Sequence, residues 1–307
     1  MNDISVFYSS LATVGVIIAL GFVLGKAKVV TAETNKHIVN LLLVVAWPCA
    51  IFSAFPQEFS LEAWRRFLIG LGGGVVVLGL VAIVSKLIFT KKLFKTELSH
   101  ESQFAFIFNN ASFLGYPLVL AMFGREALMP YCGFILVFNA ALFSYGIYLF
   151  ERKLSRKLFK ETLLNPCLIA VVLGTVFFVY SLKLPTPVNG AIGYLGAMMT
   201  PLSLICIGYM LSRAEFSKLW QHKKLFATAA LQLTLGPLIA YIALTLLNVP
   251  AEIRNILVLI QALPTATSLG LFAERYGGNP VEASELVAIS TVLSIITLPV
   301  MIGLLIV

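Results

Sequence analysis

The chain has 307 residues, of which 59% are hydrophobic and only 12% are charged, and its mean hydropathy is +0.95. Soluble domains carry about 25% charged residues and disordered chains have low hydrophobicity, so this composition excludes both classes. The formal net charge of +8 is expected to reside in loops on one side of a membrane rather than to bind nucleic acid.

Ten apolar segments follow one another along the chain. A helix needs about 20 apolar residues to cross the hydrocarbon core of a bilayer. The segments that approach this length are 6–24, 38–55, 67–89, 102–123, 130–150, 163–181, 188–211, 224–247, 251–273 and 281–306. We therefore predict an all-α membrane protein with ten transmembrane helices. Lys26 and Lys28 follow the first segment instead of preceding it, which predicts a helix there and not a cleavable signal peptide.

Basic residues are distributed unequally between the two ends of these segments. The loops after odd-numbered segments hold 17 of the 22 lysines and arginines, and the loops after even-numbered segments hold the other five. Lysine and arginine accumulate in cytoplasmic loops. The odd-numbered loops are therefore predicted to be cytoplasmic, and both termini are predicted to lie on the outer, periplasmic side.

The chain divides into two five-helix halves, 1–151 and 163–307, joined by a basic linker at 152–162 that we predict to be cytoplasmic. Three short patterns recur in the same order in both halves. They pair Trp47-Pro48 with Thr200-Pro201, Glu58-Phe59-Ser60 with Glu215-Phe216-Ser217, and Ala111–Gly115 with Ala266–Gly270. Because five is odd, the second half enters the membrane from the opposite side. Such an inverted-topology repeat is typical of secondary transporters.

Polar and helix-breaking residues occur in the middle of the fourth and ninth segments. Proline removes a backbone donor, and glycine relieves the steric limits of an unwound turn. A broken helix exposes the amide end of its second half, which carries partial positive charge and free N–H donors. Two such ends that cross at one point suit a carboxylate. The residues predicted to bind substrate are Asn109, Asn110, Gly115 and Pro117 in the fourth segment and Pro264, Thr265, Thr267, Ser268 and Gly270 in the ninth.

The alternative is a pair of proline kinks whose hydroxyls bond back to their own helices. For one segment that interpretation is preferable, but the repeat-related positions of the two breaks favour a site. Val45, Thr200 and Ser203, in the second and seventh segments, are predicted to line the opposite wall.

Acidic residues are missing from the middle of every segment, which argues against a cation–proton antiporter. Gln232 and Gln261 could ligate sodium together with backbone carbonyls, or they could simply pack in buried helix faces. The four cysteines and three histidines lack the spacing of ligand pairs, so no metal site and no cofactor are expected.

These residues resemble the auxin efflux carrier family, which includes the plant PIN-formed transporters and their bacterial relatives. The similarity lies in Asn110-x4-Gly115-x-Pro117-Leu118 of the fourth segment and in Ala262-Leu263-Pro264 of the ninth, and it extends over essentially the whole chain. The resemblance implies a scaffold of segments 1, 2, 6 and 7 and a mobile transport unit of segments 3–5 and 8–10. It also implies elevator-like transport, frequent dimers, and a contact between Asn110 and the substrate carboxylate.

Two departures from the family pattern matter for the substrate. Leu269 stands where plant members carry a second proline in the ninth segment, so Ser268 and Gly270 are expected to shape that break instead. The long cytoplasmic loop of many plant members is absent. The substrate therefore need not be auxin, and the resemblance to bacterial relatives suggests malonate or another small carboxylate.

The sequence thus predicts a transporter of the bacterial inner membrane that exports a small organic anion, driven by the membrane potential. A sodium-coupled symporter with Gln232 and Gln261 in its ion site is the first alternative. A ligand-binding sensor is less expected because the loops are short, and a channel because a pore-lining ring is absent. An enzyme is not expected, because no catalytic constellation is visible.

Overall fold

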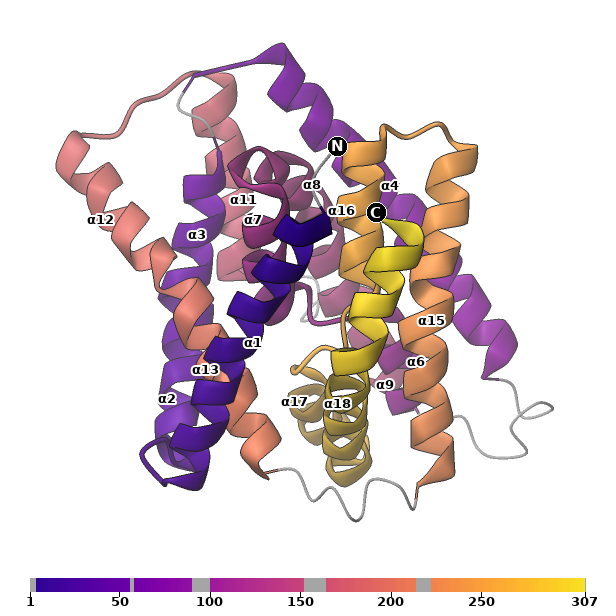
Figure 1. Cartoon of the computed structure of the whole chain (residues 1–307). Helices are drawn as coiled ribbons and strands as arrows, with labels where there is room; N and C mark the ends of the chain where they lie inside the picture. The colour runs from indigo at the N-terminus through magenta and orange to yellow at the C-terminus, as the bar shows by residue number, and fades with distance from the viewer. Residues whose placement is uncertain (1–3, 56–57, 90–99, 152–163, 214–221, 307) are drawn as a thin grey trace.

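The computed structural model describes residues 4–55, 58–89, 100–151, 164–213 and 222–306, and for residues 4–7 only the backbone. Most of these residues form helices and helical turns, and one isolated β-bridge is present. Figure 1 shows the elements, which are α1 (Ile4–Lys26), α2 (Ala32–Leu41), η1 (Leu42–Ala46), α3 (Trp47–Ala54), α4 (Leu61–Ile88), α6 (His100–Ile107), η2 (Ala111–Gly115), α7 (Tyr116–Phe123), η3 (Arg125–Ala127), α8 (Leu128–Ala141), η4 (Leu142–Gly146), α9 (Ile147–Glu151), α11 (Pro166–Val179), α12 (Thr186–Ala197), α13 (Met199–Arg213), α15 (Lys223–Leu246), α16 (Ala251–Gln261), α17 (Leu269–Tyr276) and α18 (Pro280–Leu305).

Seven helical stretches in the described residues are long and apolar enough to cross a membrane, which makes the chain a multi-pass membrane protein. They correspond to the predicted segments 1, 2, 3, 5, 7, 8 and 10. The sixth predicted segment contains the shorter helix α11, and the fourth and ninth are interrupted near their middles. The total of ten spans and the inverted relation of the two halves remain predictions. The 152–162 linker and the pattern at 215–217 lie outside the described residues.

Two π-helical turns each end shortly before a proline. Pro48 follows η1 and Pro117 follows η2, and in each case the next α-helix begins one residue before the proline. Proline cannot donate a backbone hydrogen bond and displaces the carbonyl of the preceding turn, so a widened turn at this place relieves the clash.

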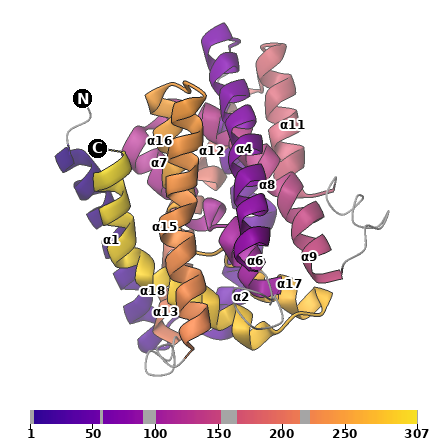
Figure 2. The same cartoon turned by 90° about the vertical axis from the view of Figure 1, so that its right-hand side faces the viewer.

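Glycines bring two helix pairs into backbone contact. A Cβ at Gly70 or Gly133 would collide with the backbone of the partner helix in the α4–α8 pair, and one at Gly21 or Gly208 would do so in the α1–α13 pair. Small residues allow this close approach. The resulting van der Waals contacts hold the helices together in a bilayer, where the hydrophobic effect does not drive helix association. Figures 1 and 2 show that the start of α1 and the end of α18 lie at the same end of the molecule, as an even number of crossings requires.

Candidate functional site

The two interrupted segments meet and pair with each other. Asn109 and Thr265 form an isolated antiparallel β-bridge. The backbone N–H of Asn110 donates to the Pro264 carbonyl at 2.7 Å, and the N–H of Ala266 donates to the Phe108 carbonyl at 3.0 Å. We call residues 108–110 the first break, residues 262–268 the second break, and their pairing the crossover. Unwound backbone at membrane depth requires such internal partners.

The first break is stabilised mainly by residues of its own segment. The Oδ1 of Asn110 accepts the N–H of Phe113 at 3.2 Å and caps η2, which leaves the side-chain NH₂ of Asn110 to point elsewhere. Gly115 and Pro117 are buried on the helix that follows. A Cβ at Gly115 would lie 3.0 Å from Leu263 Cδ1, so glycine permits the second break to approach η2 closely. The hydroxyl of Tyr131, in α8, donates to the Ala111 carbonyl at 2.8 Å.

The second break depends on side chains from neighbouring helices. The N–H of Thr265 donates to Ser290 Oγ of α18 at 3.1 Å, and its hydroxyl donates to Gln232 Oε1 of α15 at 2.8 Å. The Nε2 of Gln232 in turn donates to the Leu263 carbonyl at 3.1 Å. Thr265 and Ser290 are fully buried and Gln232 nearly so. Pro264 is also buried, whereas Thr267 and Ser268 are half-buried.

A second amide contact joins the two breaks. Asn109 Nδ2 donates to Gln261 Oε1 at 3.1 Å, and both side chains are only 2% exposed. Asn109 Oδ1 and Gln261 Nε2 are buried without a hydrogen-bond partner. The side-chain oxygens of both Gln232 and Gln261 therefore already accept hydrogen bonds. A sodium ion held by these two glutamines would have to share each oxygen with Thr265 or Asn109, or displace that donor.

A cavity of about 480 Å³ extends from the crossover toward the C-terminal end of α13 and the N-terminal end of α18. Asn110, Thr267 and Gly270 of the predicted site line it, while the other six predicted residues of the two broken segments lie in or beside the crossover. Most of its wall is apolar and comes from α13 and α18. Val45, Thr200 and Ser203 are not part of this wall. Ser203 is fully buried and donates to the Thr200 carbonyl at 3.2 Å.

Two charged side chains, Arg213 and Glu285, also line this cavity, and neither is among the residues that the sequence predicted to bind substrate. Arg213 ends α13, and no ion pair joins it to any other residue that the structure describes. Glu285 of α18 faces His222, with 3.7 Å between Oε2 and Nδ1. In the sequence, Arg213 counts only among the loop charges that predict orientation. Its position at the polar end of an apolar segment is the feature that could have indicated a place beside the site.

The cavity is suited to an organic anion. Asn110 offers amide donors, Thr267 a hydroxyl, and Gly270 lies in the first turn of α17, where backbone N–H groups lack helical partners. The helix dipole adds partial positive charge at that end. The apolar remainder of the wall would contact the carbon skeleton of a ligand. No group of three His, Cys, Asp or Glu side chains in the described ranges is placed to hold a metal.

Comparison with known proteins identifies the family. The family model described as "Membrane transport protein" matches residues 6–157 and 151–302, which is nearly the whole chain. The chain belongs to this membrane transport family. It is the auxin efflux and PIN-like family to which the motifs around Asn110 and Pro264 pointed.

Several relatives of this membrane transport protein carry transporter names. A Rhizobium meliloti protein named "Putative malonate transporter" is 23% identical over 92% of this chain and 90% of its own length. An uncharacterized transporter of Methanocaldococcus jannaschii is 25% identical over 76% of this chain and 78% of its own length. An uncharacterized transporter of Methanothermobacter thermautotrophicus is 28% identical over 62% of this chain and 63% of its own length. These names indicate a transporter rather than an enzyme.

Proposed function

We propose that this membrane transport protein exports a small organic anion, a mono- or dicarboxylate such as malonate, by elevator-type alternating access. The observation that carries the proposal is the cavity at the crossover, where Asn110, Thr267 and the start of α17 offer donors. Of the two charged side chains in its wall, Arg213 is cationic and Glu285 lies beside His222. Hydrogen-bond donors grouped at the start of a helix favour an anionic ligand over a cation.

The positions of two cavities support the elevator mechanism. The cavity at the crossover lies between α13, which belongs to the expected scaffold, and η2, α17 and α18, which belong to the expected transport unit. A second cavity of about 630 Å³ lies between α3, α11 and α12 on the scaffold side and α4, η3 and α8 on the transport side. We call them the inner and outer cavities, after their predicted sides of the membrane. Both therefore follow the boundary along which one unit would slide past the other.

We further propose a bacterial inner-membrane location, ten spans in two inverted five-helix repeats, and a homodimer embedded in the lipid bilayer. In this arrangement both termini are periplasmic and the inner cavity opens to the cytoplasm. An inside-negative potential favours anion exit by about 2.3 kcal/mol per charge per 100 mV. Export of a charged substrate along this potential requires no coupling ion, which agrees with the absence of acidic residues at the crossover.

The test is transport by the purified full chain in proteoliposomes. Radiolabelled malonate, other mono- and dicarboxylates and indole-3-acetate are offered under a set membrane potential, with and without a sodium gradient. We expect carboxylate flux that follows the potential and ignores sodium. Flux that requires sodium would instead support the symporter, and the absence of carboxylate flux or binding would refute the proposed substrate class.

A further inference from the structure

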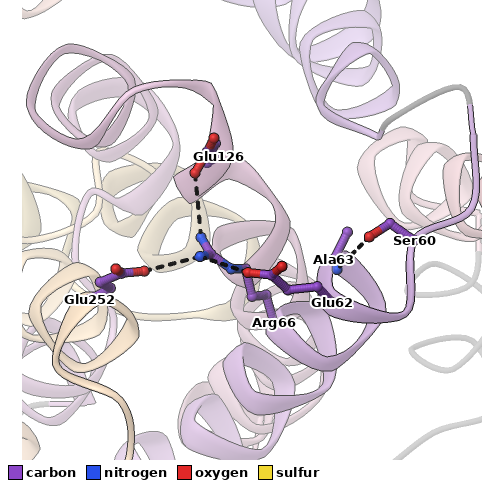
Figure 3. Close-up of polar contacts among 6 residues, drawn as sticks. All are labelled: Ser60, Glu62, Ala63, Arg66, Glu126 and Glu252. Carbon is purple, nitrogen blue, oxygen red and sulfur yellow. Dashed lines mark hydrogen bonds and ion pairs between the residues drawn. The ribbon is translucent and has the colours of Figure 1, made fainter.

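A single arginine is shared by three carboxylates at the rim of the outer cavity (Figure 3). Arg66 Nη2 lies 3.1 Å from Glu62 Oε1 and 3.2 Å from Glu252 Oε2, and Nη1 lies 3.8 Å from Glu126 Oε2. The Arg66 side chain is 26% exposed, whereas its three partners are 73–88% exposed. The guanidinium is thus the shielded centre of this group, which we call the Arg66 cluster.

The carboxylates of the Arg66 cluster come from three separate parts of the chain. Glu62 lies in the first turn of α4, Glu126 in η3 directly after α7, and Glu252 in the first turn of α16. Helices α7 and α16 are the halves of the two broken segments on this side of the crossover. At 1.5 Å per residue, the 11 residues of α16 span about 16 Å from the cluster to the second break. The eight residues of α7 span about 12 Å from the cluster to η2, which leads to the first break.

The cluster joins elements on one side of the outer cavity only. Across that cavity, Lys183 Nζ pairs with Glu58 Oε1 at 3.1 Å and connects the loop after α11 with the loop after α3. Among the described residues, no ion pair connects the Arg66 cluster with this second pair. Each rim therefore has its own ionic contacts, and no ion pair between described side chains crosses the boundary between the two groups of helices.

We propose that Arg66 is a positioning residue, which fixes the outer ends of both broken segments to α4 and so keeps the crossover in register. A planar guanidinium can contact several carboxylates at once, which a lysine ammonium does less well. Exposed ion pairs contribute little to global stability. The expected effect of losing Arg66 is therefore local: three carboxylates repel each other, α7 and α16 separate at their outer ends, and the crossover hydrogen bonds open more often.

Hydrogen–deuterium exchange of the full chain in lipid nanodiscs tests this proposal without any ligand. We compare the wild type with Arg66→Gln and with Arg65→Gln, which removes the same charge from an exposed neighbouring position. Exchange in peptides covering 108–115 and 262–268 should rise about fivefold or more in Arg66→Gln and stay unchanged in Arg65→Gln, with Arg66→Lys between them. Unchanged exchange at the crossover in Arg66→Gln, a uniform rise over all helices, or an equal rise in Arg65→Gln would overturn it.

Three further variants test whether the effect passes through α16. Glu252→Gln should raise crossover exchange by a smaller factor than Arg66→Gln. Adding Glu252→Gln to Arg66→Gln should not raise exchange further, because the contact is already lost and one of the repelling carboxylates is neutralised. Lys183→Gln, which removes the ion pair on the opposite rim of the outer cavity, should leave crossover exchange at the wild-type level. Additive effects of Arg66→Gln and Glu252→Gln would contradict the proposed link. Since these measurements need no substrate, they stand or fall independently of the proposed transport function.

Discussion

The two breaks occupy corresponding places in their segments, yet different interactions hold them. In the first break, the side chain of Asn110 caps η2 and the helix resumes after three residues. In the second break, residues 262–268 intervene before α17, and Gln232 and Ser290 of other helices bind the backbone and side chain of Thr265. A locally capped break leaves an amide free for a ligand, while a break held by neighbours depends on a tertiary network. The first is thus suited to recognition and the second to support.

The largest effect is expected from Asn110→Ala. The change removes both the η2 cap and the amide that faces the inner cavity. Carboxylate affinity should fall at least about 100-fold, since a polar group that holds a buried anion is worth roughly 3 kcal/mol. Isothermal titration and proteoliposome flux with the carboxylate identified in the transport test measure the loss.

Two further variants separate binding from capping at the first break. Asn110→Ser retains a capping side chain and should recover the fold with part of the affinity. Asn109→Ala alters the adjacent asparagine, which faces Gln261 and does not line the cavity. The carboxylate affinity of this variant should therefore remain close to that of the wild type. Unchanged affinity in a folded Asn110→Ala protein would remove Asn110 from the site.

The second break should respond in stability rather than in direct binding. Thr265→Val leaves the buried oxygen of Gln232 without its donor and should cost about 1–2 kcal/mol. Thr234→Val is the matched control, because the hydroxyl of Thr234 is exposed and bonds only to the Ala230 carbonyl of its own helix. Thermal unfolding in detergent reports the difference. Equal shifts of the melting temperature in both variants would show that the Gln232 network does not support the second break.

A smaller, one-sided effect is expected from Arg213, which lies at the end of α13 and borders the inner cavity. Arg213→Gln should raise the KM for carboxylate on that side several-fold with little change in maximal rate, because the charge attracts the anion before it reaches Asn110. The increase should shrink at high ionic strength. Lys36→Gln removes an exposed charge predicted to be on the same side and serves as control. A KM increase of the same size on both sides would contradict this role.

The sequence was most informative where local chemistry determines the structure. Asn110 followed by a glycine and a proline predicted an interruption, and one is present. The cap that the Asn110 side chain provides for η2 was not predicted. The sequence could not predict Gln232 as the partner of Thr265, because that contact joins residues 33 positions apart, one on α15 and the other in the second break. Similarly, Ser203 was a plausible wall residue by its position in the segment, but the packing of α13 turns it inward, where it bonds to its own helix.

Asn109 and Gln261 form either a packed amide pair or part of an ion site, and substitutions distinguish the two. In a packed pair, changing one residue to leucine leaves the other amide buried without its partner, so each single change should destabilise the protein. The double change to leucine should cost less than the sum of the two single changes. We expect sodium to leave the melting temperature of the wild type unchanged and to leave flux unchanged in both proteins. A sodium-dependent rise in wild-type melting temperature that disappears in the double variant would reverse this conclusion. The crossover would then bind a cation beside the anion, and the unpartnered Oδ1 of Asn109 would be available as one of its ligands.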